Sequence, residues 1–442
     1  MNFSRHNIIS NIAGTDKVVL LNILSGNADI LSAKEFSDFE KGIFAQKQAF
    51  ISKGYLVDPI MEEALYRDKY VEFLENRDSD EVQLFFVTNY TCNFKCSYCY
   101  QDEYAAPATK LNTAIIDAFF GYIRNTFAAR RKYVTLFGGE PLLAGAGHKE
   151  LIDYFLRTAS DAGIDIAVVT NGYNLSGYLE LFRKVRIREI QVTLDGTNEM
   201  HNLRRPLKNG KPTFTEIVEG IDKALDAHFP VNLRVVLDRQ NIMNLPGLAS
   251  FAIARGWVQN PLFKTQLGRN YELHHCQTET QRLYSRLSLY KDLYKLVKEY
   301  PCILEFHRPA FSVSKFLFDE GKLPSPLFDS CPGTKTEWAF DYTGKIFACT
   351  ATVGKQGEEL GTFYPEQQHF SKKIAEWEDR DILSVKECKD CIVQLACGGG
   401  CAAVAKNLTG SVCSPDCRPV KELIGLGVGL YFKEVLEQEE IK

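Results

Sequence analysis

The chain has no long hydrophobic run. None of its 442 residues belongs to a stretch of about 20 consecutive apolar side chains, which a membrane-spanning helix needs. The amino-terminal sequence MNFSRHNIISNIAGTDKVVL also has no unbroken apolar segment followed by small residues, as a secretory signal would have. The sequence therefore predicts a cytoplasmic protein with no membrane partner.

An excess of either charge is also absent. Lys and Arg number 52 against 56 Asp and Glu, which gives a formal net charge of −4 at pH 7. Such a balance provides no broad basic field to attract nucleic acid, so nucleic acid is not an expected partner. No solenoid repeat or low-complexity tract is present, and the 45% hydrophobic content is enough for large buried cores.

Cysteine is missing between Cys99 and Cys276. Three of the 13 cysteines lie at 92–99, and the other ten lie between Cys276 and Cys417. Because the cytosol keeps thiols reduced, these cysteines are better interpreted as metal ligands or thiols than as disulfides.

Strand-like and helical segments alternate from Gln83 onward. Six runs rich in Val, Leu, Ile, Thr and Phe cover 83–89, 133–139, 164–172, 188–196, 231–238 and 262–268. Helical segments lie between and after them, at 112–128, 148–162, 175–185, 214–228, 244–255 and 278–299. This alternation predicts an α/β fold, a partial (β/α)6 TIM-like barrel with its active site at the carboxyl ends of the strands.

The residues that follow the six runs fit that expectation. They are Cys92-Asn93-Phe94, Gly138-Gly139-Glu140-Pro141, Asn171-Gly172, Asp195-Gly196, Asp238-Arg239 and Gly268-Arg269. Polar groups and glycines therefore gather where a parallel barrel places its chemistry.

Two further regions flank the barrel, which we assign to 81–300. Residues 1–80 form a small α+β module with a hairpin in 17–31, a helix over 33–52, a strand at 54–57 and a charged connector at 66–81. Residues 301–442 are short pieces rich in aromatics, glycine and cysteine. No strong hydrophobic period survives there, so we expect something other than an apolar core to hold that region together.

The stretch TCNFKCSYCY places Cys92, Cys96 and Cys99 directly after the first run. A structural zinc site normally uses four protein ligands, whereas three thiolates can hold three irons of a 4Fe-4S cluster and leave the fourth iron open. By itself the trio is also compatible with a zinc or thiol site, and Gly-Gly-Glu-Pro or Asp-Gly alone is usually a turn. Their order along one βα frame favours the iron-sulfur interpretation.

The CxxxCxxC spacing resembles that of radical S-adenosylmethionine (SAM) enzymes. The resemblance implies that Cys92, Cys96 and Cys99 hold a cluster that cleaves SAM to a 5'-deoxyadenosyl radical, which abstracts hydrogen from a substrate. It implies an electron donor such as flavodoxin or ferredoxin, and an adenine contact near Tyr98.

The same resemblance extends to the later strand ends. Gly138, Gly139, Glu140 and Pro141 match a GGEP motif that receives the methionine amino group of SAM. The resemblance also implies that Asn171, Thr193 and Asp195 hold the ribose and the methionine carboxylate. Arg234 would meet that carboxylate if it points into the barrel, or form a structural ion pair if it does not.

The later cysteines resemble a SPASM extension, the region of radical SAM enzymes that holds two auxiliary 4Fe-4S clusters. The resemblance implies a first group of Cys331, Cys349 and Cys401. It implies a second group of Cys388, Cys391, Cys397 and Cys417, with Cys417 preferred over Cys413. A zinc ribbon is the alternative, since it also uses CxxC pairs.

One departure from that pattern concerns the first auxiliary group. Some relatives have another cysteine shortly before it, but residues 323–330 contain none. The fourth iron is then open to a substrate thiolate, or it recruits Cys276, Cys302 or Cys413. Gly398-Gly399-Gly400 lets the backbone wrap closely and aim N–H groups at cluster sulfurs.

The sequence favours a maturase of ribosomally made peptides (a RiPP maturase) that forms a thioether, carbon-carbon or carbon-heteroatom cross-link. Its first 80 residues resemble the winged-helix peptide recognition element that binds the leader of a precursor peptide as an added strand. An anaerobic sulfatase-maturating enzyme is the alternative, although its cysteine loop begins close to the amino terminus. A non-catalytic Fe-S redox or scaffold protein is a third possibility. No general base is identified, and Tyr342 and Asp341 are candidates only by position.

Overall fold

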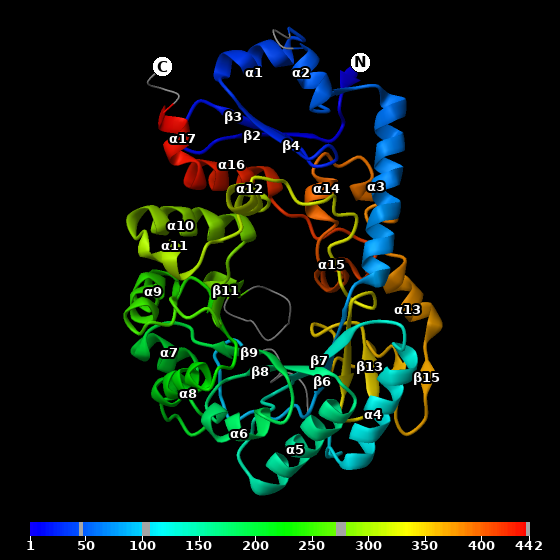
Figure 1. Ribbon diagram of the computed structural model, residues 1–442, viewed down its shortest axis with the longest axis vertical. Helices are drawn as coiled ribbons and strands as arrows, with labels where there is room; N and C mark the ends of the chain where they lie inside the picture. The colour runs from blue at the N-terminus through cyan, green and yellow to red at the C-terminus, as the bar shows by residue number, and fades with distance from the viewer. Residues whose placement is uncertain (44–46, 100–106, 271–279, 439–442) are drawn as a thin grey trace.

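A ten-stranded sheet organises the computed structural model, which describes residues 1–43, 47–99, 107–270 and 280–438 (Figure 1). Its strand order is β11-β10-β9-β8-β7-β6-β12-β13-β14-β15. The six predicted strands are all present: β6 (Val82–Val87), β7 (Lys132–Phe137), β8 (Asp165–Thr170), β9 (Ile187–Thr193), β10 (Val231–Leu237) and β11 (Phe263–Arg269). They pair in parallel, which confirms the predicted α/β fold with its partial barrel.

Helices cover the outside of this barrel (Figure 1). They are α4 (Thr113–Thr126), α5 (Ala146–Asp161), α6 (Leu179–Phe182), α7 (Asn198–Arg204), α8 (Phe214–Asp226), α9 (Leu245–Ala254), α10 (Arg286–Glu299) and α11 (Cys302–Phe306). Helix α4 illustrates the cause. Asn112 accepts from the backbone N–H of Ile115 and caps the helix, while Phe119 is buried against Phe86 of β6 with ring centroids 4.6 Å apart.

A seventh parallel strand, β12 (Glu337–Asp341), pairs with β6 and was not predicted. It leads into an antiparallel extension of β13 (Lys345–Phe347), β14 (Gly361–Thr362) and β15 (Gln368–His369). The carboxyl-terminal region therefore continues the barrel sheet, and residue Thr350, just after β13, reaches the barrel interior.

The amino-terminal module contains a separate antiparallel sheet of β2 (Asn7–Asn11), β3 (Val18–Asn22) and β4 (Asn27–Leu31). The predicted hairpin at 17–31 is its β3-β4 pair. A two-stranded pair joins β1 (Asn2–Phe3) to β5 (Leu56–Val57). The predicted helix at 33–52 is represented by α1 (Ala33–Glu40) and α2 (Lys47–Ser52), and residues 44–46 lie outside the described ranges.

The charged segment expected to be a connector is a helix, α3 (Pro59–Ser79). Asp58 caps it by accepting from the backbone N–H of Ile60 at 2.8 Å, and Pro59 suits the first turn because its missing N–H has no helical partner there. Tyr66 and Tyr70 pack against Phe328 with ring centroids 5.1 Å apart. In Figure 1 the helix runs from the amino-terminal module down toward the barrel.

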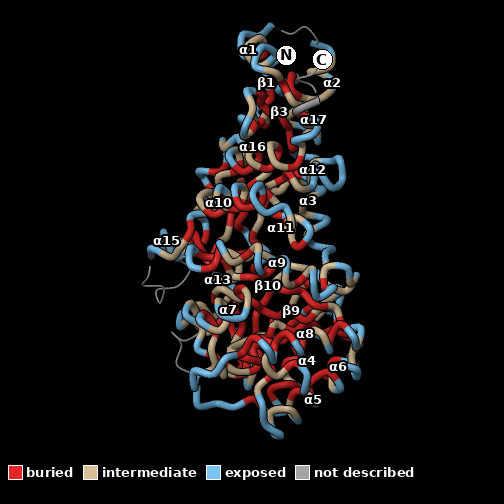
Figure 2. The backbone as a smooth tube through the Cα atoms, turned by 90° about the vertical axis from the view of Figure 1, so that its left-hand side faces the viewer, coloured by how far each residue is buried: buried red, intermediate tan, exposed pale blue. Residues whose placement is uncertain are grey.

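The expectation that no apolar core holds the region beyond residue 300 is wrong. Its helices are α12 (Ser314–Glu320), α13 (Ser371–Glu378), α14 (Gln394–Cys397), α15 (Ala402–Thr409), α16 (Val420–Tyr431) and α17 (Lys433–Gln438). Val313, Phe328 and Ile424 share a buried apolar cluster with Ile8 and Leu21 of the amino-terminal sheet. Figure 2 shows buried backbone continuing from that module into the barrel. Because the two chain ends share this core, the sequence of either end alone does not show a strong hydrophobic periodicity.

Helix α16 lies very close to the amino-terminal module. A Cβ atom on Gly425 would come within 2.1 Å of the carbonyl oxygen of Asn11, and one on Gly429 within 2.5 Å of that of Ala13. Ala13 also donates its backbone N–H to the carbonyl of Gly425 at 3.1 Å. Glycine at these positions permits the contact between the two ends of the chain.

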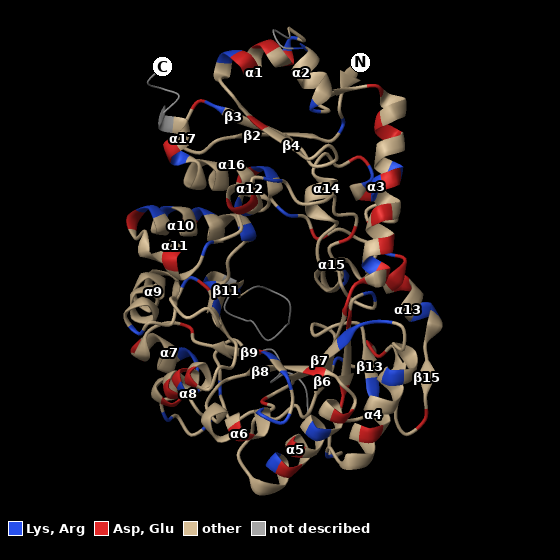
Figure 3. Cartoon of the chain, in the orientation of Figure 1, with Lys and Arg blue, Asp and Glu red and all other residues tan. Residues whose placement is uncertain are grey.

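No helix in the described part of the chain is long and apolar enough to cross a membrane. Acidic and basic side chains are intermixed along α3 and the outer barrel helices (Figure 3). Short 3-10 turns lie at Leu175–Gly177, Ile242–Asn244, Thr280–Arg282 and Lys386–Cys388.

Candidate functional site

A cavity of about 340 Å³ opens at the carboxyl ends of the barrel strands. Its lining includes Cys92, Cys96, Tyr98, Cys99, Gly138, Gly139, Glu140, Asn171, Thr193, Arg205, Arg234, Arg269, Asn270 and Thr350. The loops after β6, β7 and β8 and the ends of β9 and β10 therefore meet around one space. Of the predicted cofactor-contacting residues, Pro141 and Asp195 are not part of this wall.

All three cysteines of the first trio line this cavity. Burial, with a smaller contribution from the nearby thiols of Cys99 and Cys92, raises the pKa of Cys96 to about 12 against the opposing charge of Arg205. Burial likewise raises the pKa of Cys92 to about 11. Such thiols keep their protons until a cation replaces them, so metal loading would release protons here.

Gly138 and Gly139 bring the edge of β7 against the cysteine loop. A Cβ atom on Gly138 would lie 2.4 Å from the carbonyl oxygen of Asn89, and one on Gly139 would lie 2.1 Å from that of Thr91. The backbone N–H of Gly139 donates to Asn89 at 2.9 Å, and that of Glu140 donates to Thr91 at 2.9 Å. No side chain fits between these segments, which explains the glycine pair.

Glu140 is fully buried in the cavity wall, with 1% of its surface exposed. Its Oε1 accepts from Thr170 Oγ1 at 2.6 Å and from the N–H of Leu142 at 2.8 Å, while Oε2 accepts from the N–H of Asn171 at 2.7 Å. Burial raises the pKa of Glu140 to about 6, although these hydrogen bonds oppose the shift. The carboxylate therefore ties β7 to β8 and is charged at neutral pH.

Asp195 lies behind the wall and holds the cysteine loop in place. Its Oδ2 accepts from the Tyr98 hydroxyl at 2.6 Å and from Arg204 Nε at 3.3 Å, and its Oδ1 accepts from the N–H of Val236 at 3.0 Å. Asp195 and Arg204 are both fully buried. With its oxygens committed in this way, Asp195 differs from the expected ribose or carboxylate contact and acts on Tyr98 instead.

Asn171, Thr193 and Arg234 do line the cavity. Asn171 Nδ2 donates to Asn93 Oδ1 at 2.8 Å, which fixes the residue next to Cys92. Arg234 points into the barrel, where Nη1 lies 3.5 Å from Gln191 Oε1, and no ion pair involves it among the described residues. The side chain has the orientation required for a cofactor contact, while the contact itself stays a prediction.

Arg205, Asn270 and Thr350 also line the cavity and were not predicted from the sequence. Arg205 is 8% exposed and donates from Nη1 to the Tyr98 hydroxyl at 2.6 Å, and its buried Nε has no hydrogen-bond partner in the described part of the chain. The pair Arg204-Arg205 between two predicted elements was the available signal. Thr350 directly follows Cys349, so its proximity to the barrel could not be read without β12.

The first group of later cysteines comes together. The pKa of Cys349 lies well above the usual range, because of burial and then because Glu337, Cys331 and Cys401 add negative charge nearby. Cys331, Cys349 and Cys401 were assigned to one site from the sequence, and their role as ligands stays a prediction.

The second group also converges. Burial raises the pKa of Cys388 to about 11, with further contributions from Cys397, Cys391 and Cys417. Cys413 and Cys417 are both exposed, but only Cys417 is among the thiols that raise the pKa of Cys388. This arrangement favours Cys417 over Cys413.

The buried Arg380 lies between the segments that carry the two groups. It donates to Asp329 Oδ1 at 3.1 Å, two residues before Cys331, and to the carbonyl oxygens of Gly399 at 2.8 Å and Val412 at 2.7 Å. Its charge also favours the thiolate of Cys388. Arg380 thus positions the backbone around both cysteine groups.

The cysteines considered as a fourth ligand of the first group lie in different parts of the chain. Cys302 begins α11 on the barrel exterior, with its sulfur 3.9 Å from Ser250 Oγ of α9. Cys276 lies outside the described residues. No three His, Cys, Asp or Glu side chains within 1–43, 47–99, 107–270 and 280–438 are arranged to hold a single metal ion.

Comparison with known proteins identifies the barrel. The Radical SAM superfamily model matches residues 86–252, which carry the cysteine trio, the glycine pair and Glu140. These residues match a radical SAM domain. Such a domain implies SAM and a 4Fe-4S cluster as cofactors.

Curated relatives of this domain are partial matches. The chain is 28% identical over 166 residues to the GTP 3',8-cyclase of Campylobacter curvus (strain 525.92), a match that covers 36% of this chain and 49% of that protein. It is 28% identical over 228 residues to an uncharacterized protein of Methanocaldococcus jannaschii, covering 49% of this chain and 76% of that protein. The chain spans about half the length of the cyclases that it matches.

Two solved structures share the fold more widely. Native anSMEcpe with bound AdoMet has a TM-score of 0.58 at 17% identity, covering 81% of this chain and 99% of that one. Streptococcus suis SuiB bound to the precursor peptide SuiA has a TM-score of 0.54 at 14% identity, covering 94% of this chain and 98% of that one. At these identities the comparison establishes the fold of the chain around its radical SAM domain.

The residues around the cavity fit the cofactors that the domain implies. Three thiols supply ligands for three irons, and the close glycine backbone leaves room beside them. The unpartnered Nε of Arg205 offers a buried positive donor to a negatively charged group. The donor set and the orphaned nitrogen thus support a cluster with a chelating cosubstrate.

Proposed function

We propose that this protein is a radical SAM peptide maturase that abstracts hydrogen from a ribosomally made precursor peptide and installs a cross-link. The convergence of three cavity-lining cysteines with Gly138, Gly139 and Glu140 carries the proposal. When bound, the cluster and SAM supply an electron and a 5'-deoxyadenosyl radical for hydrogen abstraction.

The residues of the chain would bind and orient these groups. Cys92, Cys96 and Cys99 would hold three irons of the cluster. Glu140 Oε2 accepts one hydrogen bond, from the N–H of Asn171, and keeps capacity for the amino group of the methionine portion. Arg205 and Arg234 present positive charge from the same wall, which suits a carboxylate.

The later cysteines would hold two auxiliary 4Fe-4S clusters. Their division into Cys331, Cys349 and Cys401, and into Cys388, Cys391, Cys397 and Cys417, supports two sites. The first group has three members, which favours an iron open to a substrate thiolate. Asp341 is not a proposed base, because Tyr90, Thr343 and Lys345 donate to its 2%-exposed carboxylate.

The amino-terminal module supports a peptide substrate. Strand β4 is an edge of its sheet, and in the described part of the chain its backbone hydrogen bonds reach no strand other than β3. The opposite edge, β2, is covered by α16 through bonds such as Ser10 Oγ to the carbonyl of Lys421 at 2.6 Å. An open edge can accept an extended leader peptide as a further strand.

The extent of the structural likeness favours this proposal over sulfatase maturation. The likeness to SuiB extends over 94% of the chain and therefore includes much of the amino-terminal module, whereas that to anSMEcpe covers 81%. Anaerobic formylglycine formation on a sulfatase is the second candidate. A non-catalytic Fe-S protein would not require a cavity built for a nucleotide-sized cosubstrate.

Anaerobic co-expression with peptides encoded by short neighbouring reading frames tests the function. We expect mass spectrometry to show loss of hydrogen mapped to a residue pair of the peptide. The peptide mass should stay unmodified when Cys92→Ala replaces the wild type or when the leader is deleted. A formylglycine in place of a cysteine or serine would support sulfatase-type chemistry. Unchanged peptides, with SAM still cleaved, would contradict the cross-linking maturase.

A further inference from the structure

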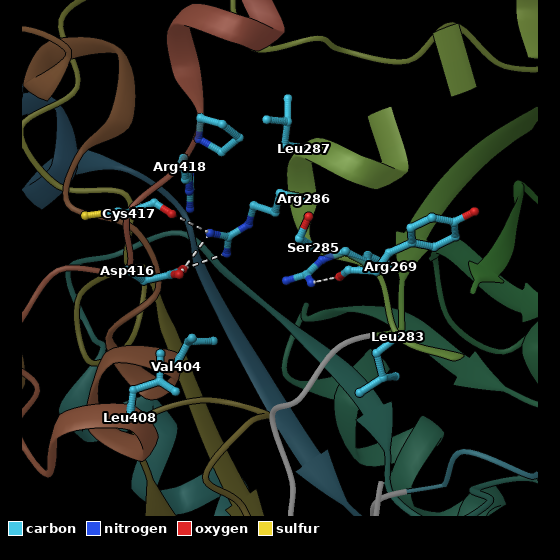
Figure 4. Close-up of a pocket in the computed structure, with 12 residues that line it drawn as sticks. Arg269, Leu283, Ser285, Arg286, Leu287, Val404, Leu408, Asp416, Cys417 and Arg418 are labelled. Atoms are coloured by element: carbon cyan, nitrogen blue, oxygen red, sulfur yellow. Dashed lines mark hydrogen bonds and ion pairs between the residues drawn. The ribbon is translucent and has the colours of Figure 1, made fainter. Parts of the chain in front are cut away.

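A second pocket, of about 600 Å³, adjoins the cofactor cavity. It lies between β11, the start of α10, helix α15 and the segment 416–419 (Figure 4). Arg269 lines both spaces, and its Nη1 donates to the carbonyl oxygen of Tyr284. A chain segment in the second pocket would therefore lie next to the position where the radical chemistry takes place.

Positive charge dominates this pocket. Its lining contains the guanidinium groups of Arg269, Arg286 and Arg418, and a single carboxylate, Asp416, among the described residues. Arg286 holds Asp416 through two bonds, Nη1 to Oδ1 at 2.9 Å and Nη2 to Oδ2 at 2.6 Å (Figure 4). Asp416 Oδ2 also accepts from the N–H of Cys401 at 3.1 Å. The carboxylate of Asp416 is therefore already bonded to groups of the protein.

The side chain of Arg418 differs from that of Arg286 in this respect. Its guanidinium forms no hydrogen bond or ion pair with any residue in the described ranges, although it lies near Asp416 and lines the pocket. A cation held in a concave, partly desolvated wall attracts a carboxylate more strongly than a cation on an open surface. Arg418 therefore adds to the pocket wall a positive charge that forms no ion pair with any described carboxylate, although it also acts on the Cys397 thiol.

The same pocket offers apolar contacts. Leu283 and Leu287 flank the start of α10, and Val404 and Leu408 come from α15 on the opposite side (Figure 4). Leu408 is 70% exposed and can therefore be covered by a bound chain. Apolar side chains with a few convergent charged groups are typical of binding sites.

We infer that this pocket binds the part of the peptide that flanks the reacting residue, and that it selects an acidic side chain beside an apolar one. The inference rests on the proposed function for its substrate and adds the chemical class of that substrate. An Asp or Glu carboxylate of the peptide meets Arg418, with Arg269 next to the cofactor cavity. Carboxylate-guanidinium pairs provide both charge and two-point geometry.

Two fluorescein-labelled peptides test this inference on the anaerobic, iron-loaded full-length protein. One has the sequence Gly-Leu-Asp-Gly-Leu-Glu-Gly, and the other replaces Asp and Glu by Asn and Gln. We expect fluorescence anisotropy to show at least about tenfold tighter binding of the acidic peptide, weakening as NaCl is raised. Equal binding of both peptides would overturn the inference.

Variants separate charge recognition from folding. Arg418→Gln should reduce the preference for the acidic peptide to less than about threefold, while Arg183→Gln, in an exposed pair on the barrel exterior, should leave it unchanged. Leu408→Glu adds a carboxylate at an exposed position and should weaken acidic binding more than Leu408→Gln. Full preference retained in both Arg418→Gln and Leu408→Glu, with iron content equal to wild type, would contradict the assignment.

SAM cleavage in the same wild-type preparation distinguishes the two claims. SAM cleavage without any preference for the acidic peptide would contradict the inference about the pocket, while it would still support radical SAM function. An acidic preference without cleavage would support the pocket and count against the function.

Discussion

The Tyr98 hydroxyl donates to Asp195 Oδ2 at 2.6 Å. It also accepts from Arg205 Nη1 at 2.6 Å. Tyr98 immediately precedes Cys99, and Asp195 follows the end of β9, so this contact attaches the cysteine loop to the far side of the barrel. Burial raises the pKa of Tyr98 well above its usual range, which keeps the hydroxyl protonated and able to donate.

Asp195→Asn should destabilise the barrel because it leaves the guanidinium of Arg204 less compensated. Both side chains of this pair are fully buried, and breaking such a pair costs roughly 3–5 kcal/mol. Since Asp238 also holds Arg204, we expect the lower end of that range, measured from urea unfolding under anaerobic conditions. Glu180→Gln, whose pair with Arg183 is exposed, should change stability by less than about 0.5 kcal/mol. Equal effects of the two substitutions would contradict this role for Asp195.

Cys417→Ser and Cys413→Ser provide a matched test of the second auxiliary group. Cys417, Cys397 and Cys391 all raise the pKa of Cys388, whereas Cys413 makes no such contribution, although both Cys413 and Cys417 are exposed. We expect Cys417→Ser to lower iron and sulfide content by up to one cluster per chain and to alter the electron paramagnetic resonance spectrum. Cys413→Ser should match wild type in both measurements. The reverse result would assign the ligand to Cys413.

Gly139→Ala should disrupt the cofactor cavity. The added Cβ would lie 2.1 Å from the carbonyl oxygen of Thr91, so either the cysteine loop or the β7 end must move. We expect SAM binding to weaken at least tenfold by equilibrium dialysis. Gly147→Ala, in α5 with no atom within 4 Å of the new Cβ, should bind SAM like wild type. Normal binding by the Gly139→Ala variant would show that the close approach is dispensable.

The strand and helix pattern of the barrel was predictable because each parallel strand is a local apolar run with polar groups or glycine at its end. Glu140 and Asn171 could be placed on the cavity wall for the same reason. The grouping of the later cysteines came from the resemblance to SPASM sequences, which assigned Cys401 to Cys331 across an intervening group. Cys331 and Cys401 both lie close enough to Cys349 to raise its pKa, and their role as cluster ligands stays a prediction.

What the sequence did not reveal depends on contacts between distant segments. Strand β12 joins the barrel sheet by pairing with β6, for example Trp338 with Leu84, which is far away in the sequence. The core shared by Ile8 and Ile424 is likewise invisible to local periodicity. Asp195 was expected on the cavity wall because its strand ends there, but the buried Arg204 draws its carboxylate behind that wall.

Acid should loosen the contact of the amino-terminal module with α3 through His6. Burial, with the nearby charge of Arg5, lowers the pKa of His6 from 6.5 to about 4, and its ring stacks on Tyr66 at 5.2 Å. Between pH 6.5 and 4 the unfolded chain binds a proton at His6 that the folded chain excludes. The contribution of neutral His6 to the free energy of unfolding is therefore fully present above pH 6.5 and is lost as the pH falls toward 4.

His6→Phe keeps an aromatic ring at that position without a titrating group. Its unfolding free energy should therefore decline less than that of wild type over this pH range, by on the order of 2–3 kcal/mol. Urea unfolding followed by circular dichroism at several pH values measures the difference. Parallel pH profiles for the two proteins would show that His6 is not the titrating group.

The most direct test of the central claim is formation of 5'-deoxyadenosine from SAM by the anaerobically reconstituted protein with dithionite. We expect product from wild type and from Cys302→Ala, whose thiol lies at Ser250 on the barrel exterior, and none above background from Cys92→Ala. Iron content measured on each sample should show one cluster fewer in Cys92→Ala alone. No product from fully loaded wild type, or equal product from Cys92→Ala, would contradict the assignment of this cavity to radical SAM chemistry.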